Sequence, residues 1–179
     1  TVYRNALAGQ VGLALKEEID TADVEQNSTE KQVLQIIEEL KPLLLPILQS
    51  IATDESGEVI KSLQPGEDDY VKVFSEELIE AAKQQYTDWT KQYRQTISFD
   101  ENTRIDAHMA PAGMLIEENA LSYHFPNGYQ SIAEKLNPQR VWVCWKIYQQ
   151  GESAGNSMNG LVWVDDHWAW FPKPYKLLK

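Results

Sequence analysis

The sequence has a single cysteine, Cys144, and it has no apolar run long enough to cross a bilayer. One cysteine cannot form an internal disulfide, so the fold does not depend on an oxidising compartment. The start at Thr1 fits either a trimmed initiator methionine in the cytoplasm or a cleaved export signal, and both compartments stay open. The longest apolar run, from Leu40 to Ile51, contains a lysine and two prolines. It is well short of the ~20 residues of a membrane-spanning helix, so we expect no membrane span.

Basic residues are also scarce. There are 16 lysines and arginines against 27 aspartates and glutamates, which gives a formal net charge of -11 at pH 7. A chain this acidic repels phosphate backbones, and it has no basic cluster to overcome that repulsion locally. We therefore expect no nucleic-acid partner.

Several sequence motifs of enzymes are missing as well. The chain has no G-x-S-x-G, no G-x-x-x-x-G-K-[ST], and no G-x-G-x-x-G after a predicted strand. These motifs build the nucleophile elbow, the phosphate-binding loop and the dinucleotide site. Their absence argues against covalent hydrolases, nucleotide hydrolases and dinucleotide enzymes, and we expect no cofactor.

What the sequence does contain predicts one α+β domain over residues 1–179, mainly helical over 1–95. Apolar residues recur every three or four positions in three stretches, at 3–19, 33–51 and 75–93. Pro42 should bend the second of these helices, because it lacks an amide hydrogen and crowds the preceding turn. Ser75 should cap the third, which we expect to run through Tyr93.

Residues 96–179 change to the period of two that is typical of strands. Strands are predicted at 104–109, 140–148, 161–164 and 168–171, with a further candidate at 113–117 and a short helix near 129–136. The glycine- and serine-rich segment 151–160 is expected to be a long loop, either functional or a plain link. Helices followed by mostly antiparallel strands make an α+β fold.

The last two predicted strands form a hairpin with unusually many aromatic residues. A two-residue turn at Asp165-Asp166 pairs Trp163 with Trp168, which share a face with Trp170. The reverse face is apolar too, with Val162, Val164, Ala169 and Phe171. Both faces must therefore be covered, one by the helices and the other by a remaining helix, a ligand or a second copy of the chain.

The segments Val164 to Trp168 and Trp170 to Pro174 resemble the terminal hairpin of the nuclear-transport-factor-like (cystatin-like cone) superfamily, which often reads V-D-G-x-W. The order of predicted elements is also similar to that of the superfamily. The ending DDHWAWFPKP resembles the tail of bacterial proteins of that kind. Here Asp166 stands where the superfamily often has glycine. The resemblance implies helices packed on a curved sheet with a concave mouth. Members include isomerases, dehydratases and cyclases as well as binding and dimerisation modules, so the fold alone does not select a function.

We expect a non-enzymatic binding or assembly module whose concave sheet face is lined by aromatic side chains. The partner is a protein, a small apolar ligand or a second copy in a homodimer. The expected ligand-binding residues are Trp142, Tyr148, Trp163, Trp168 and Trp170. The same aromatic residues also fit a plain structural core or a sugar-stacking surface.

The alternative is a cofactor-independent lyase or isomerase that uses Asp106 and His108. These residues alternate along one predicted strand and so face the same way. A carboxylate beside an imidazole tunes a histidine for acid–base work near neutral pH, and the resemblance implies such a pair inside the cavity. His167, combined with His108 or His124, is a candidate zinc ligand. No metal-ligand spacing supports such a site, so we expect no metal.

Overall fold

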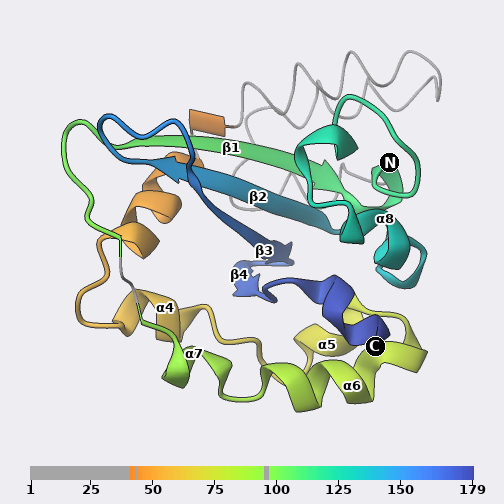
Figure 1. Cartoon of the computed structure of the whole chain (residues 1–179). Coiled ribbons are helices and arrows are strands. Elements are labelled where there is room, and N and C mark those ends of the chain that lie inside the picture. The colour runs from red at the N-terminus through yellow and green to blue at the C-terminus, as the bar shows by residue number, and fades with distance from the viewer. Residues whose placement is uncertain (1–40, 43, 95–96) are drawn as a thin grey trace.

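The computed structural model describes residues 41–42, 44–94 and 97–179. Within this part, helices lie on the N-terminal side and an open four-stranded antiparallel sheet lies on the C-terminal side (Figure 1). This arrangement confirms the α+β class. The helices predicted between residues 3 and 40 lie outside the described residues. None of the helices in the described part is long and apolar enough to cross a membrane.

Helical residues 41–42 and 44–52 come first. The helices that follow are α4 (Glu58–Ser62), α5 (Asp69–Val73), α6 (Glu76–Tyr86), α7 (Trp89–Gln92) and α8 (Gly128–Ile132). The strands are β1 (Arg104–Pro111), β2 (Val141–Tyr148), β3 (Asn156–Val164) and β4 (His167–Trp170), paired in the order β1-β2-β3-β4. Short 3-10 turns complete the chain: η2 (Ala112–Met114), η3 (Ser122–His124), η4 (Ala133–Lys135) and η5 (Pro174–Leu178).

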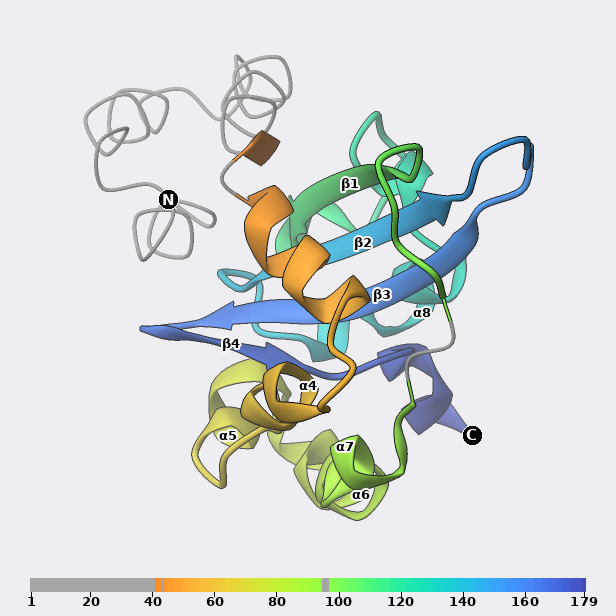
Figure 2. The same ribbon diagram turned by 90° about the vertical axis from the view of Figure 1, so that its left-hand side faces the viewer.

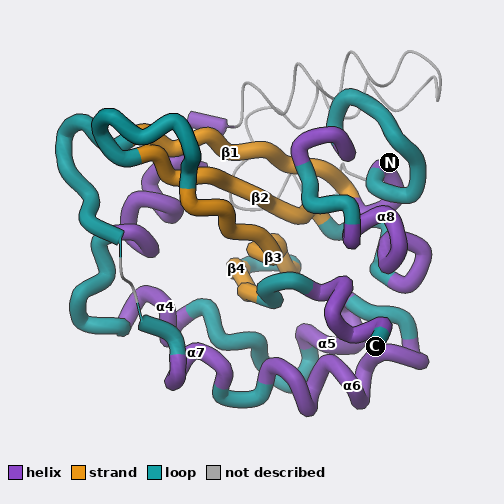
Figure 3. The backbone as a smooth tube through the Cα atoms, viewed as in Figure 1, coloured by secondary structure: helices purple, strands orange, loops and turns teal. Residues whose placement is uncertain are grey.

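The candidate strand at 113–117 is wrong. Between β1 and α8 the chain consists of loops and short helical turns (Figure 3). The side chain of Asn119 explains the difference, because its amide donates to the carbonyl of Met114 and its oxygen accepts from the amides of Leu121 and Ser122. Such local bonds give the backbone an alternative to a strand ladder.

The predicted long loop is also shorter than expected, because β3 begins at Asn156 and includes half of it. The first residues of β3 are polar and exposed, so they lack an apolar strand signature. Gly160 is an unpaired bulge residue with a φ of 97°, between the pairs Val143–Leu161 and Cys144–Asn159. The bulge changes which residues of β3 face each side of the sheet.

The hairpin of β3 and β4 has the predicted register. Trp163 lies opposite Trp168, and Leu161 lies opposite Trp170. Asp165 begins the turn with a φ of 55°. All hairpin residues at 161–164 and 168–171 are buried. Neither face of the hairpin is therefore exposed to solvent, as the sequence predicts.

The first face of the sheet contains Trp145 and the three tryptophans of the hairpin. Trp170 contacts the rings of Trp145, Trp89 and Tyr93 at centroid distances of 5.0–5.5 Å. Figure 2 shows the helix of residues 44–52 lying across β1, β2 and β3, with α4 following near β4 and α7 next to α4. These helices cover the first face.

The described residues cover only part of the second face. Near the start of β2, Trp142 packs against Phe74, Tyr129 and Phe171, so α8 and the chain around α5 and α6 close this end. Toward the end of β2 the same face becomes exposed at Lys146. This uncovered half of the second face is where the functional candidates lie.

The predicted helix through Tyr93 is wrong as a continuous element, because it breaks between Tyr86 and Trp89. In an unbroken helix the amide of Thr90 would donate to the carbonyl of Tyr86. Instead, the side chain of Gln64 binds both groups: its amide donates to the Tyr86 carbonyl at 2.7 Å, and its oxygen accepts from the Thr90 amide at 3.2 Å. A distant side chain thus replaces one helical bond. Ser75 holds the predicted N-cap position of α6, but its buried hydroxyl makes no capping bond.

Candidate functional site

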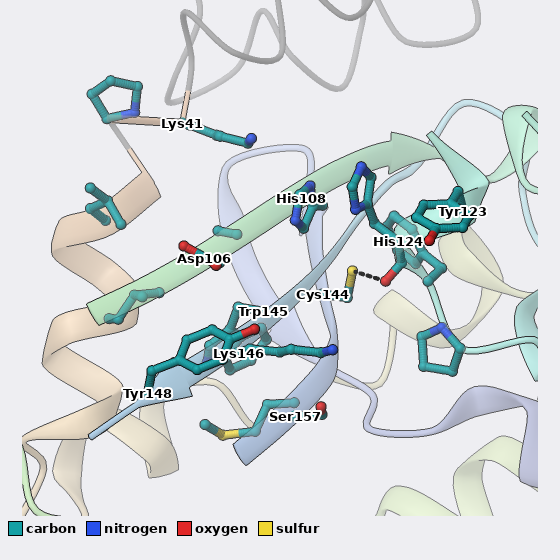
Figure 4. Close-up of a pocket in the computed structure, with 17 residues that line it drawn as sticks. Lys41, Asp106, His108, Tyr123, His124, Cys144, Trp145, Lys146, Tyr148 and Ser157 are labelled. Carbon is teal, nitrogen blue, oxygen red and sulfur yellow. Dashed lines mark hydrogen bonds between the residues drawn. The ribbon is translucent and has the colours of Figure 1, made fainter. Parts of the chain in front are cut away.

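A cleft of about 890 Å³ opens on the uncovered half of the second face; we call it the β1–β2 cleft. The strand register builds its floor, since Asp106 pairs with Lys146 and His108 pairs with Cys144. Alternation places these four side chains on one side of the sheet. The segment 123–126 forms one end of the cleft (Figure 4).

Asp106 and His108 share one face and line the same cleft, which agrees with their predicted alternation. The carboxylate of Asp106 forms an ion pair with Arg104 at 3.3 Å, and its side chain is 44% exposed. Asp106 and His108 therefore lie in an open cleft that reaches solvent.

His108 and His124 stack on each other, although they come from different segments. Their ring centroids are 3.6 Å apart, and the planes are inclined by 6°. Tyr123 then meets the ring of His124 edge-on at 5.5 Å. Tyr123 is 77% exposed, so the series of three rings ends in an accessible phenol at the cleft.

Cys144 lies on the cleft floor, and its side chain is buried. Burial raises the pKa of its thiol to about 12, although the nearby charge of Lys146 acts in the opposite direction. The neutral thiol donates to the backbone carbonyl of His124 at 3.3 Å. Cys144 is therefore a small buried residue that holds the 123–126 segment against β2.

Lys146 and Tyr148 come from the end of β2. Lys146 is exposed, and it takes part in none of the ion pairs among the described residues. The ring of Tyr148 lies under the guanidinium of Arg104, 4.4 Å from it. Gly155 packs against the same ring so closely that an added Cβ would lie 3.0 Å from it. Tyr148 is thus held in place, while the ammonium of Lys146 pairs with no carboxylate in the part of the chain that the structure describes.

The five predicted ligand-binding residues do not lie together. Trp163, Trp168 and Trp170 are buried on the first face, and Trp142 is buried on the second. Only Tyr148 lines the β1–β2 cleft. The four tryptophans belong to the core in this structure, and a ligand-binding role for them stays a prediction.

His167 lies outside the cleft, in an ionic cluster at the β3–β4 turn. Its Nε2 is 2.9 Å from a carboxylate oxygen of Asp69, and its Nδ1 is 2.7 Å from one of Asp166. Burial alone would lower the pKa of His167, but the hydrogen bonds to Asp166 and Asp69 outweigh it and raise that pKa. The neighbouring Asp165 binds Lys72 at 2.8 Å and Arg140 at 2.9 Å. The cluster fastens the turn to α5.

No three histidine, cysteine or acidic side chains among the described residues are grouped so that they would hold a metal ion. From the sequence, His124 is expected only as a metal candidate, and neither Tyr123 nor Lys146 is expected at the site. The alternation of β2 could have identified Lys146, since it shares a face with Tyr148. Tyr123 and His124 come from an irregular segment that has no such periodic signal.

Comparisons of the chain with protein-family models, curated proteins and solved structures found no match. The resemblance to the cone superfamily therefore stays a prediction.

Proposed function

We propose that the protein is a non-enzymatic binding domain whose ligand is a small organic molecule held in the β1–β2 cleft. The observation that carries this proposal is that the cleft has both the volume and the kind of lining that are typical of small-molecule sites. About 890 Å³ falls within the range of roughly 300–1,000 Å³ that is typical of small-molecule sites. The cleft combines aromatic walls with a few polar groups that converge on it, which is also typical of such sites.

The position of the cleft supports the same proposal. Helices cover the first face of the sheet, and α8 and the residues near α5 cover the second face around Trp142. The half of the second face near Lys146 and Tyr148 stays accessible. A ligand there would rest on a rigid strand floor, which limits the ordering cost of binding.

The alternative function is a lyase or isomerase that uses Asp106 and His108, and it is favoured by their common place on the cleft floor. We give it second place because Asp106 is paired with Arg104 and is 44% exposed. A general base gains most from a site that excludes water, and an exposed carboxylate that is already paired with Arg104 does not lie in such a site. Cys144 offers no nucleophile, because burial raises the pKa of its thiol.

Assembly into a homodimer is a further part of the proposal. Within the described sheet, β1 pairs with a strand on one side only, and we propose that its other edge takes a strand of a second copy. Light scattering over a range of concentrations tests this directly. A mass that stays at the 20.5 kDa of one chain at every concentration would rule the dimer out.

We also retain the cone-like superfamily as a proposal. The described order of helices, a first strand, a short helix and three further strands agrees with the order that the resemblance implies.

Blocking the cleft tests the binding function. Ser157 is exposed and lies on the cleft, so Ser157→Trp should fill it. Ser153→Trp makes the same change in the exposed turn before β3, outside the cleft lining, and serves as the control. A library of small organic fragments is screened against the full chain by amide chemical shifts. We expect fragments that move cleft resonances in the wild type and in Ser153→Trp but not in Ser157→Trp. If no fragment meets this criterion, the proposal is wrong.

A further inference from the structure

We propose that the β1–β2 cleft takes small aromatic carboxylates, with the carboxylate on Lys146 and the ring against Tyr123 and His124. This inference rests on the proposed binding function and names its ligand class. It follows from two features of the cleft. The ammonium of Lys146 lies on the floor, and the rings of His124 and Tyr123 lie at one end.

Lys146 supplies the cation. It is exposed on the cleft and is absent from the ion pairs among the described residues, in a chain whose formal net charge is -11. Figure 4 shows its side chain running along the floor, with the ammonium directed toward the end where Cys144 and His124 lie. A positive site attracts anions locally, even on an acidic protein.

The carboxylate of Asp106 lies across the sheet from Lys146 but has another partner. It pairs with Arg104, whose guanidinium also lies 4.4 Å above the ring of Tyr148. These two opposite charges largely neutralise each other. The net charge that the cleft floor offers a ligand at Lys146 is therefore positive.

The aromatic series supplies the second contact. His108 and His124 stack at 3.6 Å, and Tyr123 stands edge-on to His124. Tyr123 also borders a smaller neighbouring cleft of about 400 Å³, so it forms a ridge that is accessible from two sides. Aromatic rings add to such series in edge-to-face or offset geometry, which favours a planar ligand over a compact aliphatic one.

Three probes with the same ring and different charges test the ligand class. We would titrate the full chain with 2-naphthoate, 2-naphthamide and 2-naphthamidine and follow amide chemical shifts. We expect naphthoate to bind about two- to fivefold more tightly than the amide, because an exposed ion pair contributes little more than that, and the amidine to bind most weakly. Lys146→Met should remove this order. Lys61→Met changes the net charge equally at an exposed lysine of α4 and should leave the order intact.

Tyr123→Ala gives an independent readout. It should weaken all three probes by a similar factor, about three- to tenfold, because stacking does not depend on the charge of the ligand. If the three probes bind the cleft equally and Ser157→Trp blocks them, the anion preference is wrong while the binding function stands. If no probe moves cleft resonances, the aromatic-carboxylate class is wrong, and the fragment screen decides the binding function separately.

Discussion

Replacing Gln64 by leucine should destabilise the protein strongly, although the change keeps the side-chain volume nearly constant. The Gln64 side chain makes three hydrogen bonds: to the Tyr86 carbonyl at 2.7 Å, the Thr90 amide at 3.2 Å and the Thr90 hydroxyl at 2.8 Å. Thr90 is only 6% exposed, so its polar groups would lose their partners with little access to water. Each net bond contributes about 1 kcal/mol, and an orphaned buried group costs about 1–3 kcal/mol. We expect a loss of about 2–4 kcal/mol in the free energy of unfolding.

The assay is urea denaturation of the full chain followed by circular dichroism. Gln84→Leu, on the exposed side of α6, is the matched control and should change the free energy of unfolding by no more than about 0.5 kcal/mol. If Gln64→Leu is as stable as this control, Gln64 does not replace the missing helical bond. The break between α6 and α7 would then need another cause.

Three further predictions concern Gly160, His167 and Cys144. Gly160→Ala should lower the free energy of unfolding by at least about 2–3 kcal/mol, because the φ of Gly160 is 97° and the new methyl group would lie 2.1 Å from the backbone oxygen of Phe171. A melting temperature equal to that of the wild type within error would contradict this. His167→Asn removes a histidine whose pKa is raised by Asp166 and Asp69, against the effect of burial. The advantage of the wild type, about 0.5–1 kcal/mol after allowance for a side chain that is 45% exposed, should be full below pH ~6.5 and disappear as pH rises through the folded pKa. A gap that widens with pH in denaturation series would refute that sign. Cys144 should react with a thiol reagent at pH 8 at least ~100-fold more slowly in the native protein than in urea, and rapid native labelling would be inconsistent with its burial.

The elements that the sequence predicts well are those whose signal is local. The register of the β3–β4 hairpin follows from a period of two and a two-residue turn, and Trp163 lies opposite Trp168 as expected. The common face of Asp106 and His108 follows from the same alternation. These features need no knowledge of distant residues.

The features that the sequence does not predict depend on contacts between distant segments. The helix break follows from Gln64, which lies 22 residues before Tyr86. The bulge at Gly160 coincides with a bond from the Phe171 amide to its carbonyl. For the same reason, half of the cleft could be predicted from strand alternation, whereas the wall around Tyr123 could not.

The central claim is that ligands bind the uncovered half of the second face and do not bind the tryptophan hairpin. An amide chemical-shift titration of the full chain with 2-naphthoate tests it in one experiment. We predict saturable shifts at residues that line the cleft, at 105–108, 123–126, 144–148 and 157–158, and no shift at 161–170. Saturable shifts at 161–170 with an unchanged cleft would contradict the claim.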